Sequence, residues 1–166
     1  MKGKTAVAVA PNAFGGYRVH LGELNARGYE PETFFGSTTF TGYPIQSVFD
    51  VMKQGRADIG MVRACLLEEM VHKGLVGPDD FRVIGAKTEP RLRCLTSTAL
   101  YPDWVFAATT EALPELSRKA SAALFSMPED SEMYWSIASD FTRIDRLFKD
   151  LKIGHYSYLR AVSYTH

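Results

Sequence analysis

The chain has 166 residues, 46% of them hydrophobic, and its 19 lysines and arginines balance 19 aspartates and glutamates. This length and composition are enough for one substantial core. A net charge of zero, without a basic stripe interleaved with aromatic residues, argues against a nucleic-acid partner. The apolar stretches fall well short of the ~20 residues of a membrane-spanning helix, and the start of the chain lacks the apolar core of a signal peptide. We therefore expect a globular domain with no span or signal of its own.

The first half of the chain alternates short apolar strands with amphipathic helices. Strands are expected at residues 5–10, 32–36 and 57–62, and residues 81–87 are expected to add a fourth. A helix follows each of the first three strands, and a glycine ends each helix at Gly28, Gly55 and Gly74. The inner faces of these helices carry Tyr17, Val19, Leu21, Leu24, Ile45, Val48, Phe49, Met52, Cys65 or Leu66, Met70 and Val71. This alternation predicts an α/β fold with a doubly wound, mostly parallel sheet over residues 4–87.

Three loops should meet where the strands of such a sheet end, which is where ligands bind in these folds. They are residues 11–17, 36–44 and 62–65, and the second reads "GSTTFTGYP", in which five of nine residues carry a hydroxyl group. Hydroxyls and helix N-termini together suit a small anion such as a sulfur oxyanion, a phosphonate or a carboxylate. The candidate ligand-binding residues are Asn12, Phe14, Gly16, Tyr17, Ser37, Thr38, Thr39, Thr41, Tyr43 and Arg63.

The same residues also have ordinary structural interpretations. Serine and threonine before a helix are most often plain caps, and a single Arg63 is most often a surface residue with an acidic partner. The sequence alone leaves both interpretations open.

Other chemistries have little support in the sequence. "NAFGGY" fits neither a dinucleotide-binding loop nor a P-loop. The histidines His20, His72, His155 and His166 lack the paired spacing of metal ligands, and each is interpreted as a surface or capping residue. Cys65 opens a helix, but no histidine lies near it in sequence to act as a base. We expect no cofactor, no metal site and no catalysis.

The alternation ends near residue 88. A long irregular connection leads to an expected strand at residues 104–109, followed by helical patterns at residues 113–127, 128–140 and 142–154. The tail from residue 155 is rich in aromatic residues, which keeps a pure interaction or assembly module open as a further alternative. These late elements have no obvious sheet of their own to cover.

Several stretches resemble a known family. "KGKTAVAVAPNAFGGY", "FFGSTTFTGYPIQSVFDVMKQGRADIGMVRACLLE" and "FRVIGAK" resemble the second lobe of type II periplasmic substrate-binding proteins of the phosphonate-binding kind. More narrowly, "VRACLLE", "STALYPDWVFAAT" and "DLKIGHYSYLR" are similar to the extracytoplasmic sensor regions of bacterial histidine kinases, including those similar to tetrathionate sensors.

The resemblance implies a ligand-sensing fragment of a membrane histidine kinase, located in the periplasm, that binds a small anion. The alternative is the substrate-binding component of an ABC-type transporter for phosphonate or another anion. Residues 1–90 would be the second lobe, and residues 91–166 would be the return segment and C-terminal helices that pack on a missing first lobe. That lobe is the expected partner, a homodimer is an alternative way to cover the exposed surface, and the membrane would be reached only through a segment outside this chain.

Two features refine this expectation. Ala13, Phe14 and Gly15 stand where the family has a turn rich in serine and threonine, which disfavours phosphonate itself and leaves an anion, or a ligand with an apolar part. The resemblance to sulfur-compound sensors makes Cys65 and Cys94 a disulfide or a thiol pair near the cleft, and two ordinary buried thiols remain the alternative.

Overall fold

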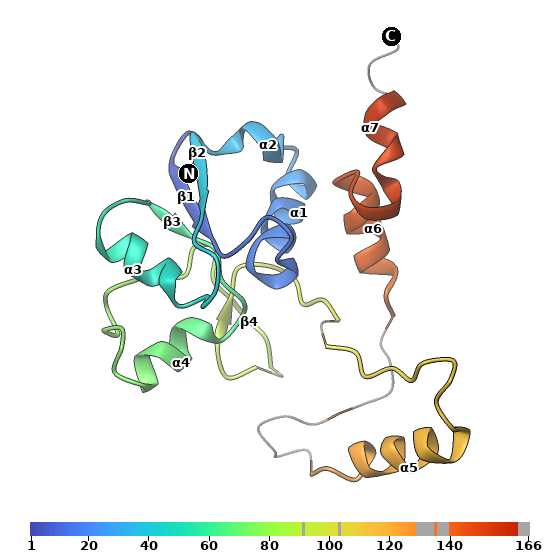
Figure 1. Ribbon diagram of the computed structural model, residues 1–166. Helices are drawn as coiled ribbons and strands as arrows, with labels where there is room; N and C mark the ends of the chain where they lie inside the picture. The colour runs from blue at the N-terminus through green and yellow to red at the C-terminus, as the bar shows by residue number, and fades with distance from the viewer. Residues whose placement is uncertain (91, 103, 129–134, 136–139, 163–166) are drawn as a thin grey trace. The chain divides into compact units, whose positions relative to one another are not determined.

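The computed structural model describes residues 1–90, 92–102, 104–128, 135 and 140–162 (Figure 1). It contains two compact units, one formed by Met1–Leu100 with Asp145–His166 and the other by Tyr101–Ile144. Most of the helix predicted at residues 128–140 lies outside the described residues.

The first unit contains a parallel three-stranded sheet. Its strands are β1 (Thr5–Ala8), β2 (Ser37–Phe40) and β3 (Ile59–Gly60), in the order β2-β1-β3. Ala6 of β1 pairs with Thr38 on one side and with Ile59 on the other. The central strand is almost wholly buried, as expected for an apolar run between two parallel neighbours. The predicted mixed α/β architecture with a parallel sheet is confirmed.

A helical segment follows each strand of the sheet, as the sequence predicts. These segments are η1 (Phe14–Arg18), which runs directly into α1 (Val19–Ala26), then α3 (Ser47–Lys53) and α4 (Leu66–His72). A further short helix, α2 (Pro31–Phe34), overlaps a predicted strand. The glycines at positions 28, 55 and 74 have φ values of +79°, +69° and +69°, the left-handed conformation with which glycine ends helices. On the inner faces, Val19, Leu24, Val48, Phe49, Leu66 and Met70 are buried.

Consecutive apolar residues of β1 point to opposite faces of the sheet, and the core packs on both faces. Val7 packs in a cluster with Val48, Val51 and Ala57, while Ala6 and Ala8 pack with Met61 and are covered by Tyr17 and Phe35. A third cluster joins α3 to α4 through Phe49, Leu66, Met70 and Val76. Both faces of the central strand are therefore covered, which fixes its two neighbours and the loops at its end.

Three predicted strands are wrong. Residues 31–34 form α2, because Pro31 occupies the first helical turn, and the strand starts later, at Ser37. Of residues 81–87, only Lys87 is in a strand, β4 (Lys87–Thr88), which pairs antiparallel with β5 (Leu95–Thr96) and not with the main sheet. Residues 104–109 form no regular structure, and Trp104 and Phe106 are exposed.

The end of the chain packs on the first unit. Here α6 (Thr142–Asp150), η2 (Gly154–Tyr156) and α7 (Tyr158–Val162) follow one another. Leu147 of α6 is buried against α1, where a Cβ at Gly22 would overlap its side chain. Phe148 lies beside Phe14, with ring centroids 6.3 Å apart, and the guanidinium of Arg18 lies 5.8 Å from the same ring.

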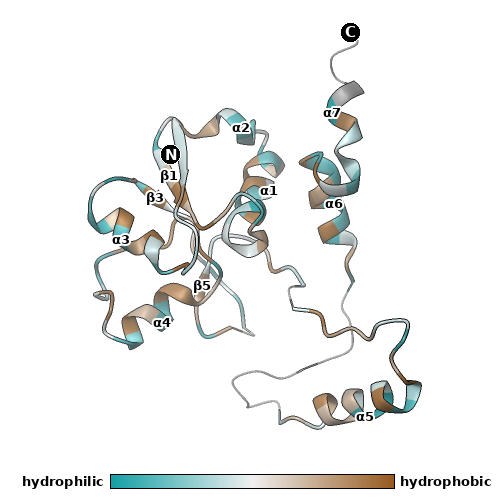
Figure 2. Cartoon of the chain, viewed as in Figure 1, coloured by the Kyte–Doolittle hydropathy of each residue, from teal (hydrophilic) through white to brown (hydrophobic). Residues whose placement is uncertain are grey.

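The second unit has one helix among its described residues, α5 (Pro114–Phe125), with Pro114 in its first turn. Apolar and polar residues alternate along it in Figure 2, and Leu116 and Phe125 are more than half exposed. The described part of this unit therefore presents apolar surface of its own.

Candidate functional site

The loops that follow β1 and β2 lie side by side. The backbone nitrogens of Thr41 and Gly42 donate to the carbonyl oxygens of Ala8 and Val9 at 3.0 and 2.9 Å, so the pairing of the two strands continues past their ends. Gly16 is buried, and a Cβ there would lie 3.6 Å from the Cδ1 atom of Ile45, just before α3. The predicted rim at the carboxyl ends of the strands is therefore present for these two loops.

The rim holds some of the predicted residues. Asn12 and Tyr43 are exposed, while Phe14, Tyr17 and Thr41 are half-buried. The Thr41 hydroxyl donates to the carbonyl oxygen of Gly42 at 2.9 Å, a local bond that a ligand could replace.

The other hydroxyl residues do not converge on the rim. Ser37, Thr38 and Thr39 belong to β2, because threonine favours the extended backbone of a strand. Ser37 pairs with Thr5 at the start of β1, at the opposite end from the rim. Their side chains alternate between the faces of the sheet. Their expected place in a loop is wrong, and the hydroxyl-rich run serves mainly as an exposed edge strand.

Thr38 instead contacts Tyr17. Burial raises the pKa of the Tyr17 phenol, and a hydrogen bond with the Thr38 side chain partly opposes this rise, while the Glu32 carboxylate adds to it. The Tyr17 ring also packs edge-on against Phe40, with centroids 5.1 Å apart. These contacts hold the helical segment after β1 against β2.

Arg63 lies beside the first loop. A Cβ at Gly15 would be 3.8 Å from the Cβ atom of Arg63. The Nη2 atom of Arg63 donates to Oε2 of Glu69 at 2.7 Å, and Lys73 donates to the other oxygen, Oε1, at 2.6 Å. Both bonds lower the pKa of Glu69, first that of Lys73 and then that of Arg63. Because Lys73 is a second partner, Glu69 stays paired if Arg63 turns to an anion.

Cys65 and Cys94 form a disulfide, one of the alternatives that the sequence left open. Their Cα atoms are 5.1 Å apart, within the range that a bridge requires. Cys65 comes directly before α4, and the bridge fastens the irregular segment around Cys94 to that helix. The backbone nitrogen of Leu95 also donates to Oε1 of Glu68 in α4, at 3.0 Å.

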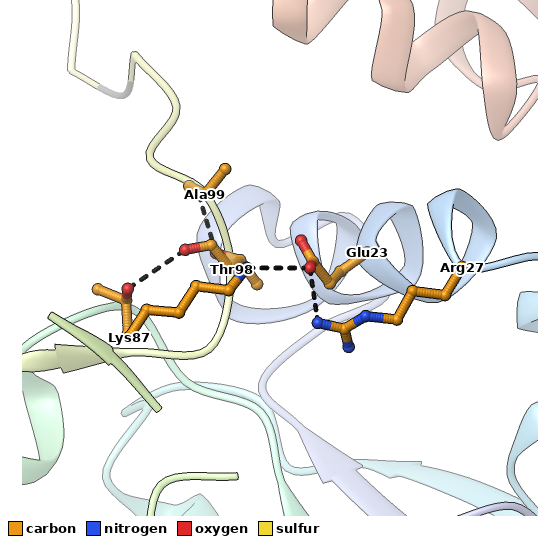
Figure 3. A network of polar contacts seen from close by, with 6 residues as sticks. Glu23, Arg27, Lys87, Thr98 and Ala99 are labelled. Atoms are coloured by element: carbon orange, nitrogen blue, oxygen red, sulfur yellow. Dashed lines mark hydrogen bonds and ion pairs between the residues drawn. The ribbon is translucent and has the colours of Figure 1, made fainter. Parts of the chain in front are cut away.

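A polar network that the sequence did not reveal lies between α1 and the β4–β5 hairpin (Figure 3). Oε1 of Glu23 accepts from Arg27 at 2.8 Å and from Lys87 at 3.1 Å. Nearby, the Thr98 hydroxyl donates to the carbonyl oxygen of Ala99 at 3.0 Å. Glu23 and Arg27 are four residues apart on one helix face. This spacing favours an ion pair, so this part of the network could be predicted from the sequence.

His20 lies on the same face of α1, and the expectation of a surface histidine is wrong. Its Nδ1 atom is buried and has no hydrogen-bond partner among the described residues. Burial lowers the pKa of its imidazole to about 4, although the Glu23 carboxylate acts in the opposite direction. The side chain is therefore neutral at physiological pH.

Among the described residues, no three histidine, cysteine, aspartate or glutamate side chains gather closely enough to hold a metal ion. None of the helices formed by the described residues is long and apolar enough to cross a membrane.

The disulfide should contribute measurably to stability. For cysteines 29 positions apart, the chain-entropy estimate is roughly 3 to 4 kcal/mol. We expect the double variant Cys65→Ser/Cys94→Ser to lose about this much free energy of unfolding in urea titrations. Reductant should lower the stability of the wild type and leave the variant unchanged. Equal stability of the wild type with and without reductant would contradict the assignment.

His20 should make the fold sensitive to mild acid. Its pKa is about 4 in the folded chain and close to 6.5 when unfolded, so the unfolded state gains a proton first as the pH falls. We expect this group to cost roughly 3 kcal/mol of stability between pH 6.5 and 4. The variant His20→Leu should reduce the loss, and His72→Leu, at an exposed position, should not. If the free energy of unfolding fell equally with pH in the wild type and in His20→Leu, this prediction would be wrong.

Comparison with known proteins identifies the family. The family model for the periplasmic substrate-binding protein of phosphonate ABC transporters matches residues 1–148. The chain is 34% identical over 150 residues to the tetrathionate sensor histidine kinase TtrS of Salmonella typhimurium strain LT2, a match that covers 90% of this chain and 25% of the relative. No solved structure matches. The predicted resemblance to this family is confirmed: the chain belongs to the phosphonate-binding family of periplasmic substrate-binding proteins.

Proposed function

We propose that this chain is one lobe of a doubly wound, type II binding fold from the extracytoplasmic sensor region of a membrane histidine kinase. Its ligand is a small anion, with a sulfur oxyanion first among the candidates. Membership in a substrate-binding family supports a binding role over a catalytic one and an extracytoplasmic location for the parent protein. The relative that is named as a tetrathionate sensor supports the sensor context and the ligand class.

The observation that carries the proposal is the position of Arg63 beside the loop that follows β1. An anion at this rim would meet a guanidinium group, the Asn12 amide and the Thr41 hydroxyl, all from segments that the sheet holds together. Arginine binds planar or tetrahedral oxyanions with two parallel hydrogen bonds, which gives both affinity and orientation.

Aromatic rings make the same rim suitable for a ligand that is only partly polar. Phe14 and Tyr17 are half-buried near the loop, and Tyr43 is 81% exposed. Divalent sulfur atoms pack favourably against aromatic rings, whereas a bare phosphonate has only oxygens to present on most sides. A polythionate, with sulfonate ends and a sulfur chain between them, fits this mixture of groups.

Signalling follows from closure of two lobes around the ligand. A ligand that contacts both lobes favours the closed form by its differential affinity, and the C-terminal helices would pass that change towards the membrane. On this proposal residues 1–90 are the second lobe and residues 91–166 return towards the first, apart from residues 92–100 and 145–162, which belong to the same compact unit as the second lobe. The contribution of this chain is then half of the cleft, and its affinity alone is weak.

The alternative is that the chain belongs to a transport component. The matching family model, which describes the substrate-binding proteins of phosphonate ABC transporters, supports this alternative. The sequence of the parent protein distinguishes the two. An apolar run of about twenty residues followed by a kinase core supports the sensor.

The pair Arg63 and Glu69 provides the test. We expect tetrathionate to bind the wild-type chain with an affinity weaker than micromolar, Arg63→Gln to weaken binding about tenfold or more, and Glu69→Gln to strengthen it by freeing Arg63. Titration calorimetry at low salt measures all three, and Arg56→Gln, an exposed arginine outside the rim, is the matched control.

Sub-micromolar binding by this chain alone would contradict the half-cleft proposal. Unchanged binding in Arg63→Gln would remove the proposed site.

A further inference from the structure

The helices at the end of the chain dock on α1 and α2. Leu147 of α6 is buried, and a Cβ at Gly22 of α1 would overlap its side chain. The Nη2 atom of Arg160, in α7, lies 3.3 Å from Oε1 of Glu32 in α2. The Nε atom of the same arginine donates to the carbonyl oxygen of Lys152 at 3.0 Å, which ties α7 to the end of α6. The buried contact supplies most of the docking energy, since an exposed ion pair contributes little.

A further contact of α6 reaches the loop that follows β1. The Phe148 ring lies beside the Phe14 ring, with centroids 6.3 Å apart, and its centroid is 5.8 Å from the guanidinium carbon of Arg18. Phe14 and Arg18 are the first and last residues of η1, so one side chain of α6 contacts both ends of that segment. The ring is also confined by its own segment, because a Cβ at Gly154 would lie 3.1 Å from Cδ2 of Phe148.

The segment η1 carries the loop with it. It is a π-helical turn, in which the backbone nitrogen of Arg18 donates to the carbonyl oxygen of Ala13 at 3.0 Å. Turns of this kind are rare and occur often at functional sites. The Arg18 side chain also reaches back into the loop, where its Nε atom donates to the carbonyl oxygen of Pro11 at 3.4 Å. Pro11 directly precedes Asn12, a residue of the proposed anion site, so the contacts of Phe148 act on the backbone that carries this amide.

The sheet provides a second, stronger anchor for η1. Tyr17 packs edge-on against Phe40 of β2 and covers Ala6 and Ala8 of β1. This packing belongs to the core and does not involve α6. An aromatic pair and a cation–π contact at a partly exposed ring are each worth little by comparison. Phe148 is therefore placed to adjust the loop without deciding the stability of the fold.

We propose that Phe148 is a positioning residue for the anion site, and that docking of α6 on η1 and binding of an anion at the rim favour each other. This inference rests on the proposed function. In the docked state the Phe148 ring keeps Phe14 and Arg18 where they hold Pro11 and Asn12 at the rim. An anion that binds this arrangement favours the docked helix by the same factor, because coupling between two binding equilibria is reciprocal. The docking of α6 then reports whether the rim is occupied.

Substitutions in the 166-residue chain separate the ring from general packing. Titration calorimetry with tetrathionate at low salt should show binding about threefold to tenfold weaker in Phe148→Leu, which stays apolar but has no ring. Phe148→Tyr, which restores the ring, should bind as the wild type does. Arg18→Gln should weaken binding to a similar extent, and the double variant Arg18→Gln/Phe148→Leu should lose no more than the larger single loss. Phe141→Leu, at an exposed position just before α6, is the matched control and should bind normally.

Hydrogen exchange measures the coupling from the side of the helix. Tetrathionate should slow the exchange of the backbone amides at residues 147–153 in the wild type, but not in Phe148→Leu or in Arg63→Gln. A purely structural role of Phe148 would not make α6 respond to a ligand at the rim. Without ligand, exchange at residues 13–18 should be faster in Phe148→Leu than in the wild type, while exchange along β1 should be equal.

The outcomes separate this inference from the proposed function. If the wild type binds no tetrathionate, the proposed function fails and the coupling fails with it. If the wild type binds and Arg63→Gln does not, the proposed function stands. The coupling is then wrong if Phe148→Leu binds as tightly as the wild type, or if exchange in α6 does not change when tetrathionate is added to the wild type.

Discussion

The burial of β1 is the constraint on which the rest of the first unit depends. Val7 and Ala8 are fully buried, and Ala6 and Val9 are 1% exposed. A strand this deeply buried must pair its backbone groups on both sides, because unpaired buried amides are costly. It therefore requires β2 and β3 as parallel neighbours, and parallel pairing brings the loops at the ends of the strands to one edge.

The alternation of side chains along β1 determines what covers the sheet. The small side chains of Ala6 and Ala8 leave room for Tyr17 and Phe35, while Val7 packs against Val48 of α3. Tyr17 is the last residue of the loop after β1 and lies in η1, so its packing sets the position of that loop. The geometry of the rim is thus a consequence of core packing. The exposed rim residues do not take part in that packing and can contact a ligand.

The disulfide extends this framework to α4. Arg63 lies two residues before Cys65, at the point where β3 leads into the helix. A bridge at Cys65 ties the backbone two residues after Arg63 to the segment around Cys94. On the proposed function, the same bond would help to hold Arg63 in place.

The sequence predicted those parts of the fold that local signals determine. The apolar run at Thr5–Ala8 and the helix-ending glycines could be recognised because each reflects a short-range preference. The strand predicted at residues 32–36 was wrong because Pro31 favours a helical turn strongly enough to outweigh two phenylalanines. The density of hydroxyl groups in residues 36–44 suggests a binding loop, but threonine favours the extended backbone, and Ser37–Phe40 form β2.

Long-range features could not be predicted in the same way. Residues 104–109 have a strand pattern, but a strand forms only when a partner edge is available, and no local signal reports that. The burial of His20 depends on the packing of segments far apart in the sequence, so its unpaired nitrogen became visible only in the structure. The adjacency of the loops after β1 and β2 follows from the general rule for parallel sheets, whereas the binding role of Asn12, Thr41 and Arg63 stays a prediction.

We propose that the carboxyl ends of the strands bind a small anion. A titration of the isotope-labelled chain with tetrathionate, monitored through the backbone amide chemical shifts, tests this binding and is well suited to weak affinities. The proposal predicts that the largest changes occur at residues 12–17, at residues 41–43 and at Arg63. Changes concentrated at Ser37–Thr39 or along β3, with the rim unaffected, would contradict it.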